Sequence, residues 1–213
     1  MKKLLCLMSA LFFSFNLFAV ELKEGVHYEV ISDSTPTAKP EIKEFFSYYC
    51  PHCFTFEPLA DRLKAGEKKG KYKFVKSHVD FLRAAGPDIQ FMLTKALVTA
   101  EKLNVPAASK AIFNYIHKQR APFTKEKDIR NLFVLNGVDG AKFDKVFNSF
   151  AVTAAAKKMK KDQDTLNNKR VLTGVPTFIV NNKYKILNSG FNAKNYDELF
   201  GQLENAAIEL SQK

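Results

Sequence analysis

Cysteine and tryptophan are scarce in this chain, whose 213 residues include three cysteines and no tryptophan. One cysteine, Cys6, lies in an N-terminal stretch typical of a cleaved export signal, so the mature chain is expected to keep only Cys50 and Cys53. A single pair cannot form the framework of several disulfides found in many small secreted domains. The scarcity therefore favours a chemical role for this pair over a structural one.

Acidic residues are also few: 22 Asp and Glu stand against 33 Lys and Arg, which gives a formal net charge of +11. An excess of this sign can mark nucleic-acid binding. The basic residues are scattered, however, without interleaved aromatic residues, and an exported protein seldom meets nucleic acid. We therefore interpret the charge as that of a solvated surface and expect no nucleic-acid partner. Weak attraction to anionic membranes or acidic client proteins is the alternative.

Residues 1–19 have the pattern of a signal peptide. Two lysines follow Met1, an apolar run extends from Leu4 to Phe18, and Ala19 provides a small residue for cleavage. The run is at the short limit for a membrane-spanning helix and lacks charged residues at its far end, so an uncleaved anchor is the weaker interpretation. The sequence predicts an exported protein that keeps the chain from about residue 20.

The residues after the signal indicate an α/β domain interrupted by helices. Residues 20–82 alternate between strand and helix patterns. The predicted elements are an edge strand over 27–31, a strand over 41–49, a helix over 51–66 and a strand over 72–81. This order is that of a parallel β-α-β crossover. Pro58 falls inside the predicted helix and is expected to kink it, because proline cannot donate a backbone hydrogen bond.

Residues 83–160 differ in composition and carry apolar side chains at helical spacing. They predict an inserted helical subdomain of about four helices, leading into a longer helix near residues 150–170. Residues 161–213 return to the α/β pattern. The elements predicted there are a strand over 177–180, a hairpin turn at Asn181-Asn182, a strand over 184–187 and a helix over 195–210.

The two remaining cysteines stand in Cys50-Pro51-His52-Cys53, between a predicted strand and a predicted helix. A helix N-terminus offers unpaired N–H groups and a partial positive charge, which favour a thiolate at Cys50. Pro51 suits the first helical position, and His52 adds a donor or a positive charge. A stabilised thiolate makes the disulfide easy to transfer. The motif therefore predicts a dithiol oxidase, with Cys50 as the nucleophile and Cys53 as the more buried resolving thiol.

Two other uses of the motif are weaker. Half of a zinc site would need a second cysteine pair or two closely spaced histidines, and the four histidines of the chain provide none. A purely structural disulfide would close a loop too short to stabilise the fold much.

The chain resembles the DsbA family of bacterial periplasmic thiol–disulfide oxidoreductases, which have a thioredoxin-like fold. The matching segments are Glu44-Phe45-Phe46-Ser47, Cys50-Pro51-His52-Cys53, Lys76-x-His78-Val79, Gly174-Val175-Pro176 and Val180-Asn181-Asn182-Lys183-Tyr184. The resemblance implies a thioredoxin-like α/β fold formed by residues 20–82 and 161–213, with residues 83–160 as the helical insertion.

The resemblance also implies roles for residues far from the thiols. Pro176 would be cis and lie against the active site, although most X–Pro bonds are trans and the sequence alone favours trans here. Val175 would expose backbone that pairs with an extended client segment. Glu44 would be a buried carboxylate near the thiols, balanced by Lys76. The alternatives are a solvated charge on an edge strand for Glu44 and a snorkelling side chain for Lys76.

The predicted function is that of a monomeric periplasmic dithiol oxidase. By resemblance, an exposed Cys50 would form a mixed disulfide with newly exported client proteins, and Cys53 would be its buried partner. A quinone-linked inner-membrane protein of the DsbB type would reoxidise the pair, and no metal or organic cofactor is needed. The alternatives are a reductase or isomerase of the same fold, and a redox-independent chaperone or peptide-binding module. Pro51-His52 and Val175 favour the oxidase.

Overall fold

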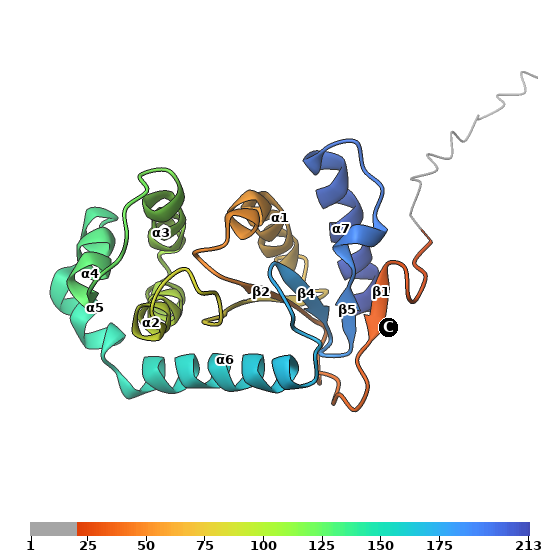
Figure 1. Ribbon diagram of the computed structural model, residues 1–213, viewed down its shortest axis with the longest axis horizontal. Coiled ribbons are helices and arrows are strands. Elements are labelled where there is room, and N and C mark those ends of the chain that lie inside the picture. Colours follow the sequence, from red (N-terminus) through yellow and green to blue (C-terminus); the bar gives the residue numbers. More distant parts are fainter. Residues whose placement is uncertain (1–20) are drawn as a thin grey trace, which may run out of the picture.

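The computed structural model describes residues 21–213 (Figure 1). The predicted signal peptide, residues 1–19, lies outside the described residues, and so does Cys6. In the described part of the chain, no helix combines the length and the apolar character needed to cross a membrane. A single sheet lies at the centre of these residues, with helices on both of its faces (Figure 1).

The sheet has five strands in the order β1-β5-β4-β2-β3. Their bounds are β1 Tyr28–Val30, β2 Glu41–Phe46, β3 Lys73–His78, β4 Thr177–Val180 and β5 Tyr184–Ile186. Strands β2 and β3 are parallel, as the predicted crossover requires, and the other neighbouring pairs are antiparallel. The turn between β4 and β5 lies at Asn181 and Asn182, both at positive φ, a conformation that asparagine tolerates well.

Seven α-helices and one short 3-10 helix, η1, complete the described residues. Their bounds are α1 Pro51–Glu67, α2 Pro87–Leu103, α3 Pro106–His117, α4 Glu126–Leu135, α5 Gly140–Phe147, α6 Phe150–Asn168, η1 Asn188–Gly190 and α7 Tyr196–Ser211. Helices α1 and α7 cover one face of the sheet, and α6 runs along the other (Figure 1).

Apolar side chains of the strands alternate between these two faces, as the two-residue period of a strand requires. On one face, Ile42 and Phe178 pack with residues of α1 and α7. On the other, Phe45 and Ile179 pack with Leu166 of α6. A third cluster joins the end of β2 to helices α2–α5 and includes both cysteines. The thiols therefore lie where the sheet meets the helical block.

Helices α2–α6 lie between β3 and β4 and correspond to the predicted helical insertion. Four helices, α2 to α5, lead into the longer α6, as expected. α6 packs against α2 and continues beneath the sheet (Figure 1). The boundary expected at residue 160 falls inside this continuous helix. We therefore place the end of the insertion at the end of α6.

The strand before the thiols is shorter than expected. β2 ends at Phe46, where the prediction extended to Tyr49, and its parallel partner β3 ends at His78. Aromatic residues suit a strand, but the N–H of Cys50 donates to the carbonyl of Ser47 at 3.0 Å. The chain turns at this bond, so residues 47–50 form a loop with no strand partner.

The helix that carries the thiols continues through Pro58. α1 runs from Pro51 to Glu67 as one helix, although the proline cannot donate a backbone hydrogen bond. Leu59 and Leu63 beyond the proline remain buried in the cluster beneath α1 and α7, and the kink expected at Pro58 stays a prediction.

Two glycines give a matched test of how η1 packs against the segment before β1. A Cβ at Gly190 would lie 1.9 Å from the backbone oxygen of Val26, whereas a Cβ at Gly201 in α7 would meet nothing within 4 Å. Gly190→Ala should lower the free energy of unfolding by roughly 1–3 kcal/mol, because the segment before β1 must move. Gly201→Ala should raise it by about 0.5–1 kcal/mol through helix propensity. Urea unfolding measures both, and equal effects of the two substitutions would contradict this packing of the edge strand.

Candidate active site

Cys50 lies at the start of α1, in the helix-capping position that the sequence predicts. Its backbone is extended (φ −90°, ψ 113°), and Pro51 opens the helix. The N–H of Cys53 donates to Sγ of Cys50 at 3.1 Å. One unpaired donor of the helix N-terminus is thus directed at the sulfur. Both cysteines are free thiols in the structure, which is the reduced form of the predicted redox pair.

The two thiols have pKa values shifted in opposite directions. A hydrogen bond from the Cys53 thiol lowers the pKa of Cys50 to about 7; burial opposes this shift, and the backbone N–H groups of Cys53 and His52 add to it. Burial raises the pKa of Cys53, and the neighbouring Cys50 raises it further. Only the thiolate attacks or leaves readily in disulfide exchange. The geometry therefore suits Cys50 as the reactive sulfur and Cys53 as the protonated partner.

Cys50 is less exposed than the resemblance implied. It is 6% exposed and Cys53 is fully buried, so the order of exposure is the expected one, but both belong to the core. The cause is the loop before β4: the Cys50 thiol donates to the carbonyl of Val175 at 3.5 Å.

In this structure, His52 acts on the pKa of Cys50 through its backbone. Its side chain is exposed, and the group of His52 that lowers the pKa of Cys50 is its backbone N–H. The role predicted for its imidazole stays a prediction.

The loop before β4, which carries Val175 and Pro176 and is here named the proline loop, lies against the sulfur of Cys50. The Val175-Pro176 bond is cis, as the resemblance implied and against the trans bond favoured by the sequence alone. Thr177 Oγ1 donates to the carbonyl of Gly174 at 2.7 Å, and Asn188 Nδ2 donates to that of Pro176 at 3.3 Å. These bonds leave the half-buried Val175 facing Cys50, 125 residues away in the sequence.

Glu44 is a buried carboxylate beneath the thiols. It is fully buried on β2, directly opposite Lys76 in the register with β3. Lys76 Nζ lies 3.5 Å from Glu44 Oε2, yet neither carboxylate oxygen of Glu44 has a well-oriented hydrogen-bond partner. Burial raises the pKa of Glu44 to about 7, and the positive charge of Lys76 only partly opposes this shift. Neither Glu44 nor Lys76 is a solvated surface charge.

Glu57 belongs to the same charge cluster and was not anticipated from the sequence. It forms an ion pair with Lys76 from its position on α1, four residues after Cys53. Burial by itself would lower the pKa of Lys76, but Glu44 and Glu57 together raise it. The four-residue spacing places Glu57 on the helical face of Cys53, which is the signal that could have found it.

A cleft of about 450 Å³ opens between α1, β3, α2 and α3, and Glu57 and Lys76 are among its lining residues. The side chains of this pair are 17% and 16% exposed, in contrast to the fully buried Glu44. The ion pair therefore connects Glu44 to solvent. Within residues 21–213, no group of three His, Cys, Asp or Glu side chains is arranged to hold a metal ion.

Known proteins resemble this chain in sequence and in fold. Residues 41–204 match the model of a family described as the DSBA-like thioredoxin domain. The chain belongs to the DsbA family. It is 35% identical over 201 residues to the thiol:disulfide interchange protein DsbA of Pectobacterium carotovorum, covering 92% of each chain, and 30% identical to that of Escherichia coli K12 over the full length of both.

Solved DsbA structures share the fold. The disulfide oxidoreductase DsbA of Proteus mirabilis superposes with a TM-score of 0.77 at 28% identity, covering 91% of this chain and 98% of that one. A second structure shows the DsbA of that species with a non-covalently bound peptide, PWATCDS, at a TM-score of 0.76 and 28% identity, covering 91% of this chain and 100% of that one. The thioredoxin-like fold is confirmed. The chain is a thiol–disulfide oxidoreductase, and the predicted DsbA-type disulfide oxidase function is confirmed at the level of the family.

The raised pKa of Glu44 predicts a pH-dependent stability. Between its ordinary pKa of 4.5 and about 7, Glu44 loses its proton in the unfolded chain but keeps it in the folded protein. The wild-type protein therefore loses stability as the pH rises through this window. Glu44→Gln cannot ionise, so its free energy of unfolding relative to wild type should increase by about 2–3 kcal/mol between about pH 4 and about pH 8.

Denaturant unfolding at several pH values measures this difference. Glu41→Gln is the matched control, since Glu41 lies on the same strand and pairs with Lys43 near the surface. A stability difference for Glu44→Gln that does not change with pH would contradict the raised pKa.

Proposed function

We propose that the protein oxidises pairs of client thiols in the periplasm through a mixed disulfide at Cys50. A client thiolate attacks Sγ of Cys50 in the oxidised protein, the Cys50–Cys53 bond breaks, and Cys53 leaves as a thiolate. A second client thiolate then attacks the client sulfur of the mixed disulfide and releases Cys50. The client gains a disulfide, and the protein is left with two reduced cysteines. The observation that carries this direction is the N–H of Cys53 directed at Sγ of Cys50 at 3.1 Å, which helps to lower the pKa of Cys50, since a stabilised thiolate is a good leaving group.

Cys53 needs a proton when it leaves, because burial disfavours its thiolate. Glu44 is the proposed source. Its pKa of about 7 keeps a substantial fraction protonated at neutral pH, and its charge is among the groups that raise the pKa of Cys53. Lys76 balances the carboxylate after the proton has gone, and Glu57 extends the cluster to the cleft.

Val175 and Pro176 are proposed to present the client. The carbonyl of Val175 lies against the Cys50 thiol, so an extended client segment that pairs with this backbone brings its own cysteine to the sulfur. The bound peptide in the Proteus mirabilis DsbA structure supports peptide recognition of this general kind.

The proposed location and partners follow from the signal predicted in residues 1–19 and from the family. We expect a monomer in the periplasm that acts on reduced, newly exported proteins. A quinone-linked inner-membrane oxidase of the DsbB type would return the thiols to the disulfide. No metal or organic cofactor takes part in the proposed cycle.

Trapping the mixed disulfide tests the roles of the two cysteines. Cys53→Ala, with Cys50 first activated as a mixed disulfide with thionitrobenzoate, should form a stable covalent adduct with a peptide that carries one thiol, because the peptide thiolate displaces thionitrobenzoate and no resolving thiol remains. Oxidation of a peptide with two thiols is assayed separately, with glutathione disulfide as the final oxidant. Cys50→Ala should form no adduct and should lose the oxidation of the peptide altogether. Mass spectrometry of quenched reactions measures both. Peptide oxidation by Cys50→Ala at the wild-type rate would overturn the proposal in favour of a redox-independent function.

The His52 side chain is tested by titrating the thiolate. His52→Ala should raise the pKa of Cys50 and make the protein less oxidising, because it removes the imidazole predicted to give the thiolate a donor or a positive charge at the helix N-terminus. Thiolate absorbance against pH and equilibrium with glutathione measure the two effects. The wild type should be more oxidising than thioredoxin. An unchanged titration in the variant would mean that His52 acts only through its backbone N–H.

A further inference from the structure

His117 contacts the thiol motif on both of its sides. It is the last residue of α3, in the helical insertion. Its Nε2 lies 2.8 Å from the carbonyl oxygen of Tyr48, two residues before Cys50. Its ring stacks on Phe54, the residue after Cys53, with centroids 5.2 Å apart and planes 9° apart. One imidazole thus connects the two ends of the motif to the insertion.

The bond to Tyr48 defines the tautomer of His117. A carbonyl oxygen only accepts hydrogen bonds, so Nε2 must carry the hydrogen. The carbonyl also has no alternative partner in the sheet, because the ladder of β2 ends at Phe46. A backbone carbonyl in a largely buried loop needs a donor, and His117 provides it.

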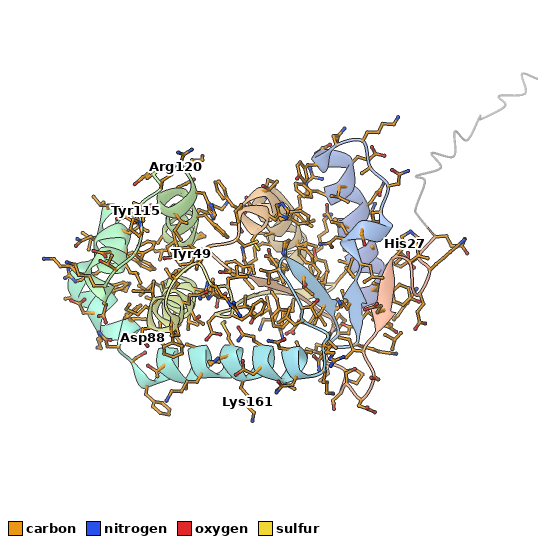
Figure 2. The ribbon with its side chains drawn as sticks, viewed as in Figure 1. His27, Tyr49, Asp88, Tyr115, Arg120 and Lys161 are labelled. Carbon is orange, nitrogen blue, oxygen red and sulfur yellow. The ribbon has the colours of Figure 1, made fainter. Side chains whose placement is uncertain are left out.

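The same loop has a second tie to the same helix. The hydroxyl of the fully buried Tyr48 lies 2.6 Å from Oγ of Ser109, two turns before His117 on α3. Tyr49 lies between α1 and the insertion in Figure 2, where the loop carrying Cys50 passes between them. Both contacts hold Tyr48, which lies inside the turn that the N–H of Cys50 closes on the carbonyl of Ser47 and that places Cys50 at the start of α1.

We propose that His117 is a positioning residue for the reactive thiol, a role that rests on Cys50 being the nucleophile as proposed above. By its hydrogen bond to the carbonyl of Tyr48, His117 keeps Sγ of Cys50 at the 3.1 Å distance from the N–H of Cys53 that helps to stabilise its thiolate, and the ring packed on Phe54 has a smaller effect. Hydrogen bonds weaken steeply as their angle departs from linearity, so a small shift of the loop reduces this stabilisation. The helical insertion thereby sets the redox property of the thioredoxin-like part.

Two substitutions separate the hydrogen bond of His117 from its stacking. His117→Phe keeps an aromatic ring on Phe54 but leaves the carbonyl of Tyr48 without its donor. His117→Gln keeps an N–H near the position of Nε2 but loses the ring. His117→Phe should raise the pKa of Cys50 and shift the equilibrium with glutathione about threefold to tenfold toward a less oxidising protein, while His117→Gln should stay within about twofold of wild type.

His27→Phe is the matched control. The ring of His27 packs on Phe191 with centroids 5.0 Å apart, and Figure 2 shows His27 at the far end of the molecule from Tyr49. The thiolate titration and the glutathione equilibrium of His27→Phe should equal those of the wild-type protein. Thermal unfolding of all three variants separates a loss of stability from a change in the thiols, since a merely structural role moves the melting temperature alone.

An unchanged Cys50 pKa and glutathione equilibrium in His117→Phe would overturn the proposal. If that variant does not fold, nitrogen NMR of wild-type His117 at alkaline pH decides: the Nε2–H tautomer supports the bond to Tyr48, and the Nδ1–H tautomer refutes it. A failure of this proposal can be distinguished from a failure of the proposed function. If Cys50→Ala loses peptide oxidation while His117→Phe keeps the wild-type Cys50 pKa and glutathione equilibrium, only the role of His117 is refuted.

Discussion

The active site depends on the donors that Cys53 directs at the sulfur of Cys50: its thiol, and its backbone N–H, which forms a hydrogen bond across the first turn of α1. This bond requires Cys50 to stand just before the helix in an extended conformation, which the end of β2 and the turn at Ser47 provide. The proline loop then reaches the same sulfur from the other side. Each part of the fold near the thiols either creates this arrangement or brings a client to it.

A single buried environment has opposite effects on the groups within it. Burial raises the pKa of both Cys53 and Glu44, because neither receives enough hydrogen bonds to offset the loss of water. Cys50 is nearly as buried, yet its pKa falls, since donors from Cys53 and His52 point at its sulfur. The reactivity of the pair therefore depends on two causes: burial, which raises the pKa of Cys53, and the N–H and S–H groups that point at the sulfur of Cys50.

Local features of the active site could be predicted from the sequence, and features made by distant contacts could not. The thiol motif, the strand at 177–180 and the Asn181-Asn182 turn depend on neighbouring residues, and the structure has them where the sequence indicates. The cis bond before Pro176 could be expected only from the family resemblance, because local preference favours trans. His117 has no local signal of chemistry, and the only local signal for Glu57 is its four-residue spacing from Cys53. Their roles come from the helix packing that brings them to Lys76 and Tyr48.

The helical insertion is part of the active site because of where the sheet ends. Pairing stops at Phe46, and the following loop cannot satisfy its own backbone groups by strand hydrogen bonds. The insertion supplies what the sheet does not: a donor for the carbonyl of Tyr48, a partner for its hydroxyl, and an apolar cluster that encloses both cysteines. If the insertion were absent, water would satisfy this loop and the position of Cys50 would be less restricted. The insertion is therefore needed to hold the nucleophile at the start of α1, in addition to shaping the surface around it.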